Sequence, residues 1–90
     1  MIPTIGRIVH YTLSAQDAAT INAHRAAAGP ISANPVYEGD VYPMMIVRVW
    51  GGNADSAVQG QVFIDGNFTF WATSVSLGEG PRTYAWPERS

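Results

Sequence analysis

The sequence predicts a mainly β protein: a small, strongly bent antiparallel barrel of the SH3-like type, with about five strands and one helix inserted after the first strand. Two observations lead to this prediction. Short segments rich in β-branched and aromatic residues are separated by turn signals, among which Asp65-Gly66-Asn67 is a strong hairpin signal. One alanine-rich stretch follows the first of these segments. Ninety residues are enough for one domain, so we expect residues 1–90 to form a single small β-barrel domain.

The first strand is expected over residues 5–12, where β-branched residues dominate. The helix is expected over about 14–28. At its start, Ser14 and Asp17 have the spacing of a capping box, with Asp in place of the usual Glu. Gly29 and the proline that follows it form a stop signal. The apolar face of this helix is thin, so we expect it to lie on the sheet as a lid.

After a loop over 29–40, the central strand is expected over 41–50 (VYPMMIVRVW). Strict alternation would place Arg48 on the same face as Ile46 and Trp50. Both faces of this segment are apolar, so we expect both to be covered, one by the barrel interior and the other by the helix or another subunit. The remaining strands are expected at 57–65, 68–75 and 83–86.

The charge content argues for self-association and against nucleic acid. Only 13% of the residues are charged, against a usual value of about 25%. A small protein with so few charges leaves apolar surface uncovered, so we expect a homo-oligomer. All five cationic residues are arginines spread along the chain, and this spread gives no basic stripe for duplex nucleic acid. One or two arginines are nevertheless enough to bind a small planar anion.

The sequence contains no cysteine and no secretory signal pattern. Its longest apolar run, around 41–47, is too short to cross a bilayer. We therefore expect a soluble, intracellular protein that does not act at a membrane.

We expect neither catalysis nor a metal site or other cofactor. Most acidic residues lie at predicted turns or caps, where short acids bond local amides. Asp17 and His24 are seven positions apart on the helix, and we expect both to be solvated. Two histidines without cysteine do not make a convincing metal-binding set.

Two arginines are candidate ligand contacts. Arg48 lies in an apolar strand, so its guanidinium must find an acid, a carbonyl or an anion. The alternative to a ligand is an internal salt bridge, with Glu79, Asp40 or Glu88 as the partner. Arg82 lies in a Gly-Pro turn near Thr73 and Ser74, and is the better candidate for an anion, because the backbone amides of Gly78 and Gly80 could also face the ligand.

Aromatic residues supply the other candidates. Trp71 lies between two threonines on its own face, a half-polar setting for a stacking platform. Trp86 is either a packing plug or a ligand contact, and His10 is either a core-edge histidine or a contact at a barrel mouth or subunit seam. The phenylalanines are expected in the core. The full set of candidate ligand-binding residues is His10, Arg48, Trp71, Thr73, Ser74, Arg82, Tyr84 and Trp86.

Five segments of the chain carry a family resemblance: GRIVHYTL at 6–13, PMMIVRVWG at 43–51, QVFIDGN at 61–67, WATSV at 71–75 and GPRTYAWPER at 80–89. On these segments the chain resembles a widespread family of small, uncharacterised phage and prophage proteins of about this length. Family members usually have Trp-His-Trp-Pro near the end, whereas this chain has Tyr84-Ala85-Trp86-Pro87.

The resemblance implies a phage accessory protein in the cytoplasm of the infected bacterial host, without a biochemical role to transfer. Three functions fit a small, non-catalytic phage protein. The first is an anti-defence sponge that sequesters a host immune nucleotide signal, either an ADP-ribose-type compound or a cyclic nucleotide. The second is a virion structural or decoration protein. The third is an inhibitor that binds a host protein directly.

Overall fold

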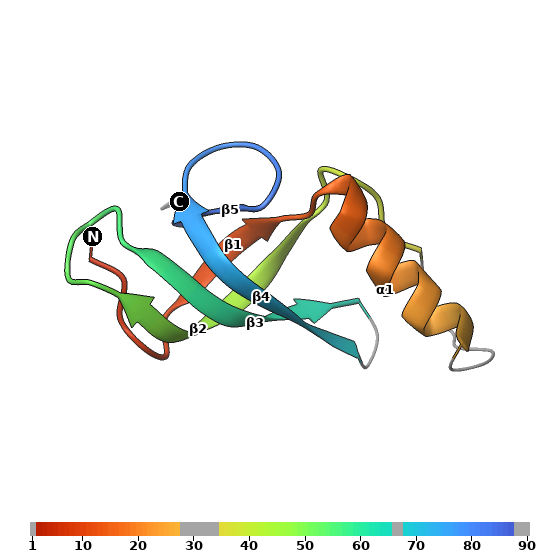
Figure 1. Cartoon of the computed structure of the whole chain (residues 1–90), viewed down its shortest axis with the longest axis horizontal. Coiled ribbons are helices and arrows are strands. Elements are labelled where there is room, and N and C mark those ends of the chain that lie inside the picture. Colours follow the sequence, from red (N-terminus) through yellow and green to blue (C-terminus); the bar gives the residue numbers. More distant parts are fainter. Residues whose placement is uncertain (1, 28–34, 66–67, 88–90) are drawn as a thin grey trace.

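Five strands form a closed barrel with one helix after the first strand, in a computed structural model that describes residues 2–27, 35–65 and 68–87 (Figure 1). The predicted fold class, a small SH3-like barrel, is confirmed. The expected loop at 29–40 and the turn after Asp65 lie partly outside the described residues. The elements are β1 (Ile8–Thr12), α1 (Ala15–Ala27), β2 (Val41–Trp50), β3 (Ala57–Ile64), β4 (Phe68–Leu77) and β5 (Thr83–Ala85).

The strands follow one another around the barrel in chain order, and β5 returns to pair with β1. Every pairing is antiparallel except that between β4 and β5, which is parallel. The predicted antiparallel arrangement thus holds at every pairing except this one seam. A closed ring of five strands cannot alternate in direction throughout, so one neighbouring pair must be parallel. Here it is β4 and β5, whose connecting loop arches back over the barrel in Figure 1.

The start of α1 is fixed by the capping box that the sequence predicts. The backbone amide of Asp17 donates to Ser14 Oγ, and the amide of Ser14 donates to Asp17 Oδ2, both at 3.0 Å. The hydroxyl of Tyr11 donates to the same Asp17 oxygen at 2.5 Å. Asp17 is consequently buried, and the expectation that it is solvated is wrong. Its carboxylate thus connects the end of β1 to the first turn of α1.

The helix lies against one end of the barrel, not over a sheet face as a lid (Figure 1). Its apolar stripe, Ala18 and Ile21, is buried. Near its other end the guanidinium of Arg25 donates to the backbone carbonyl of Asp65, at the end of β3. The hydrophobic core, which the barrel strands and α1 share, consists of Val9, Tyr11, Leu13, Ala18, Ile21, Val36, Met44, Ile46, Val58, Val62, Ile64, Ala72, Val75 and Tyr84.

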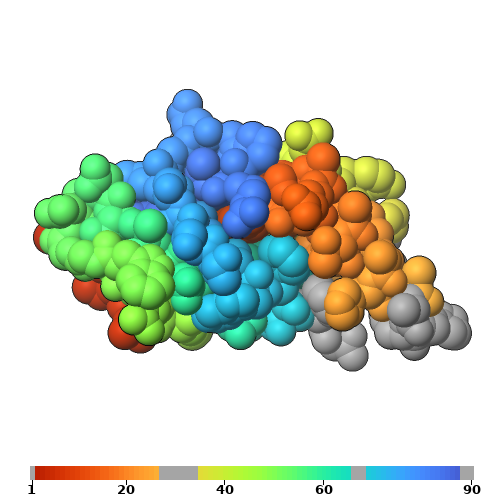
Figure 2. Space-filling view, in the orientation of Figure 1, coloured from red at the N-terminus to blue at the C-terminus, as the bar shows by residue number. Residues whose placement is uncertain are grey.

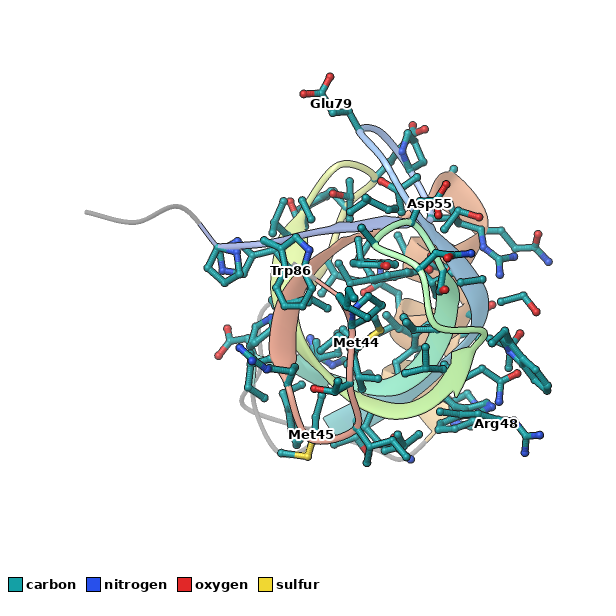
Figure 3. All side chains as sticks on the ribbon, turned by 90° about the vertical axis from the view of Figure 1, so that its left-hand side faces the viewer. Met44, Met45, Arg48, Asp55, Glu79 and Trp86 are labelled. Carbon is teal, nitrogen blue, oxygen red and sulfur yellow. The ribbon has the colours of Figure 1, made fainter. Side chains whose placement is uncertain are left out.

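A β-bulge in β2 changes which side chains face the core. Ile46 pairs with Gly60 and Arg48 pairs with Gln59, so Val47 is an extra residue on β2. An extra residue reverses the alternation of a strand. Ile46 is buried as predicted, but Arg48 points to the exterior, which corrects the prediction that the two share a face (Figure 3).

A second bulge lies in β4. There Thr73 and Ser74 together oppose Gln59 of β3, because the pairs on either side are Gly60 with Ala72 and Val58 with Val75. Ser74 adopts a positive φ of 52°. As a result the side chain of Val75, and not that of Ser74, points into the core. The inner side of β4 therefore stays apolar, with Ala72 and Val75 both buried.

The outer face of β2 is exposed within the single chain, so the helix does not cover it, and the expected cover by another subunit stays a prediction. Val41, Met45 and Val47 are exposed by 52%, 38% and 37%. The prediction of a core position is wrong for Phe63 of β3, which is 41% exposed, whereas Phe70 is partly buried against the core. The first strand begins at Ile8 instead of residue 5, because Gly6 turns the chain with a φ of 93°.

Candidate functional site

The candidate site is a pocket at the barrel end opposite α1, between the N-terminal segment and the end of β2. In Figure 2 these two parts, in red and green, lie together at the left of the molecule. Backbone hydrogen bonds hold them side by side: the amide of Gly6 donates to the carbonyl of Ile46 at 2.8 Å, and the amide of Ile46 donates to the carbonyl of Arg7 at 2.9 Å. This pocket, called the Arg48 pocket here, has a volume of about 640 Å³ and is lined by Ile2, Pro3, Thr4, Ile5, Val47, Arg48, Val49, Gly51 and Gly52.

Arg48 reaches this pocket because of the bulge at Val47. In an unbroken strand its side chain would point into the core, where an unpaired guanidinium is costly to bury. The extra residue turns Arg48 and Trp50 to the exterior together, two positions apart. The guanidinium carbon of Arg48 then lies 4.1 Å from the centre of the Trp50 ring, a cation–π contact that restrains the side chain.

The charge of Arg48 has no acidic partner in the described part of the chain. The predicted salt bridge to Asp40 or Glu79 is not formed, and the third predicted partner, Glu88, lies outside the described residues. A guanidinium on an aromatic ring keeps its N–H edge available, since the ring occupies only its face. Arg48 therefore presents planar donors toward any anion that enters the pocket.

The glycines of the β2–β3 loop form the other polar side of the Arg48 pocket. Gly51 has a φ of 105°, a conformation that residues with a side chain rarely adopt, and Gly52 has open space where a side chain would be. Gly52 therefore leaves its backbone uncovered beside the pocket, whereas Ser56 Oγ lies 3.2 Å from the position that a Cβ of Gly51 would take. The aliphatic side chains of Ile2, Ile5 and Val47 supply the apolar side, with Ile5 exposed by 72%.

The loop that carries these glycines is anchored from inside the barrel. The amide of Asn53 donates to Ser56 Oγ at 2.9 Å, and the hydroxyl of Tyr84 donates to the carbonyl of Ser56 at 2.7 Å. Burial raises the pKa of Tyr84, and the nearby charge of Asp55 adds to the shift. Tyr84 was predicted as a ligand contact, but the structure places it in the core as a support of the loop.

Two other predicted residues, His10 and Trp86, line a second pocket on the outer side of β1 and of its neighbours β2 and β5. This Trp86 pocket has a volume of about 450 Å³. Trp86 also packs edge-on against Tyr84, with ring centres 6.4 Å apart and planes at 85°. It therefore acts both as a packing residue and as a pocket wall. The lining residues are His10, Thr12, Val41, Ala85, Trp86 and Pro87.

Arg82, Thr73 and Ser74 lie together, but at the seam where β5 closes the barrel. Arg82 adopts a φ of 61°, its amide donates to the carbonyl of Thr12 at 2.8 Å, and its Nη2 donates to the carbonyl of Thr73 at 3.3 Å. The amide of Gly78, expected to face an anion, instead donates to the carbonyl of Tyr84. These contacts give the Arg82 cluster a structural role.

Trp71 lies on the outer face of β4, opposite Gln61 of β3, and is 45% exposed. It lines neither the Arg48 pocket nor the Trp86 pocket. The eight predicted residues are thus distributed over five places: the two pockets, the core, the seam at Arg82 and the outer face of β4. Sequence reasoning missed most of the Arg48 pocket, although the exposed isoleucines beside Pro3 and the Gly51-Gly52 pair were visible signals.

Within the described part of the chain, no group of three His, Cys, Asp or Glu side chains is arranged to hold a metal ion. Among the same residues, no helix has the length and apolar character needed to cross a membrane. Comparison with protein-family models, curated proteins and solved structures found no match.

Proposed function

We propose that this chain is a non-catalytic binding protein that captures a small anionic molecule in the Arg48 pocket. In the cytoplasm of an infected bacterium, such a phage accessory protein would sequester a host immune nucleotide signal of the ADP-ribose or cyclic-nucleotide kind. The observation that carries this proposal is the guanidinium of Arg48, which is stacked on Trp50 at 4.1 Å, makes no ion pair in the described chain and lines a pocket.

The chemistry of Arg48 favours a phosphate. Arginine donors match the oxygens of a phosphate in a bidentate arrangement, and a hydrogen bond between charged groups is roughly twice as strong as a neutral one. Because the stacking on Trp50 already restrains the side chain, binding would cost little additional conformational entropy.

The rest of the Arg48 pocket suits the remainder of a nucleotide. Its volume of about 640 Å³ lies within the range of about 300–1,000 Å³ that is usual for small-molecule sites. Ile2 and Ile5 offer aliphatic surface for a base or ribose, and Gly52 lets a ligand approach the backbone. The described lining holds a cation, a hydroxyl and apolar groups without a carboxylate or imidazole, a composition that fits capture of a ligand without acid–base chemistry.

A thermal-shift and calorimetry screen against linear and cyclic ADP-ribose derivatives and cyclic dinucleotides tests this proposal. We expect at least one phosphate-bearing compound to bind, adenosine without phosphate to bind far more weakly, and the bound compound to be recovered unchanged after the protein is denatured.

Trp71→Ala is the matched control in that screen, because Trp71 lies outside the Arg48 pocket. We expect it to bind like the wild type. Absence of binding across the panel would contradict the proposal, and recovery of a chemically altered compound would show that the protein is an enzyme.

A second candidate function, a virion structural or decoration protein, is favoured by a different observation. Phe63 and Trp71 are exposed by 41% and 45% on the outer face of β3 and β4. Large apolar side chains exposed together are typical of surfaces that contact other proteins. Detection of the chain in purified phage particles would support this function over sequestration.

A further inference from the structure

The barrel has an uncharged outer face centred on β1. The register pairs Ile8 with Met45, His10 with Pro43 and Thr12 with Val41, and on the other side it pairs His10 with Ala85. Alternation sends all of these side chains outward, because Val9 and Tyr11 between them are buried. The face, called the β1 face here, consists of Ile8, His10, Thr12, Val41, Pro43, Met45 and Ala85.

The β1 face is apolar and carries no Asp, Glu, Lys or Arg. Ile8, Val41 and Met45 are exposed by 42%, 52% and 38%. Figure 3 shows Met45 pointing away from the barrel at the lower left, while Met44 points into it. The Trp86 pocket opens on this same face, since His10, Thr12 and Val41 belong to both. A hollow, uncharged surface of this kind is typical of a protein–protein contact.

Arg7 and Glu38 place opposite charges at the two ends of the β1 face, and Arg82, also beside Thr12, donates its guanidinium N–H to the carbonyl of Thr73. Arg7 precedes Ile8 at one end, and Glu38 lies in the turn that leads into Val41 at the other. Both side chains are exposed, and neither makes an ion pair within the described chain. Because β1 and β2 are antiparallel, the Ile8–Met45 pair and the Thr12–Val41 pair mark these opposite ends.

We propose that the β1 face is the contact with a second copy of this chain, packed face to face with its β1 running in the opposite direction. This arrangement sets the uncharged centre of one copy on the uncharged centre of the other. It also brings Arg7 of each copy to Glu38 of the other, whereas strands running in the same direction would bring like charges together. The charge pattern is thus complementary to itself, and the second copy covers the Trp86 pocket.

Charge reversal tests this proposal by sedimentation velocity over a range of protein concentrations. We expect the wild type to form a dimer. Arg7→Glu and Glu38→Arg should each weaken the dimer by about tenfold, since every reversal replaces two attractive pairs by two repulsive ones. The double variant should return to within about threefold of the wild type, because it restores both pairs with their signs exchanged.

Glu79→Arg is the matched control, with the same change in net charge on the exposed loop between β4 and β5, which projects away from the β1 face in Figure 3. It should leave the dimer unchanged. The proposal is overturned by a wild type that is monomeric at every concentration, by a double variant no better than the single variants, or by a control that weakens the dimer as much as Glu38→Arg.

Discussion

Gly60→Ala is expected to destabilise the fold by about 3 kcal/mol. Gly60 lies in β3, where it pairs with Ile46 of β2. A Cβ atom at this position would lie 2.4 Å from the carbonyl oxygen of Met45 and 2.6 Å from Cγ of Met44. Both distances are shorter than contacts between such atoms can be, and the oxygen belongs to a paired strand that cannot move alone. The added methyl group must therefore force β2 and β3 apart.

Urea unfolding followed by tryptophan fluorescence measures this effect, with Gly52→Ala as the control. Gly52 has open space where a Cβ would lie, so its substitution should change the free energy of unfolding by less than about 0.5 kcal/mol. An unfolding midpoint of Gly60→Ala equal to that of the wild type would mean that the two strands are not packed as described.

Asp17→Ala is expected to cost about 3 kcal/mol of stability. One carboxylate oxygen of Asp17 accepts hydrogen bonds from the Ser14 amide and from the Tyr11 hydroxyl. Its removal takes away half of the capping box and leaves the hydroxyl of Tyr11, a side chain with no exposed surface, without its acceptor. Burial and the bond to Asp17 together raise the pKa of Tyr11, so this hydroxyl stays protonated and must be paired.

The double variant Tyr11→Phe/Asp17→Ala separates the two contributions. Tyr11→Phe removes the hydroxyl that Asp17→Ala leaves unsatisfied, so we expect the double variant to be about 1 kcal/mol more stable than the sum of the single changes predicts. Strict additivity in chemical unfolding would show that the hydroxyl and the carboxylate are not coupled.

Local signals account for the parts of the fold that could be predicted from sequence. The capping box is complete within Ser14 and Asp17, so its two hydrogen bonds follow from four consecutive residues. The central strand, 41–50, has the predicted bounds because nearly all of its residues other than Pro43 favour a strand. In both cases the information lies in neighbouring residues.

Contacts between distant segments account for the failures. The bulge at Val47 depends on how β2 pairs with β3, and nothing within β2 marks it. The parallel pairing of β5 with β4 follows from the closure of a five-strand ring, in which β5 also pairs with β1. The burial of Asp17 depends on Tyr11, which lies in a different element. Alternation within single strands could not reveal any of these.

Of the residues that form the Arg48 pocket, only Arg48 could be predicted from the sequence. Arg48 was identified because a cation in an apolar strand needs a partner. Its setting was not, because Ile2 and Ile5 come to Arg48 only through the backbone bonds that join the N-terminal segment to β2. The sequence favours Arg82 as the anion contact, but in the structure its guanidinium donates a hydrogen bond to the carbonyl of Thr73 at the seam between β4 and β5.

The most direct test of the proposed function is a calorimetric titration of the wild type and of Arg48→Met with ADP-ribose. Methionine keeps an apolar side chain over Trp50 but removes the guanidinium. We predict that the wild type binds and that Arg48→Met binds at least about tenfold more weakly, the loss expected when a charge-assisted contact to a phosphate is removed. Equal affinity of the two proteins for ADP-ribose would contradict the assignment of the Arg48 pocket as the binding site.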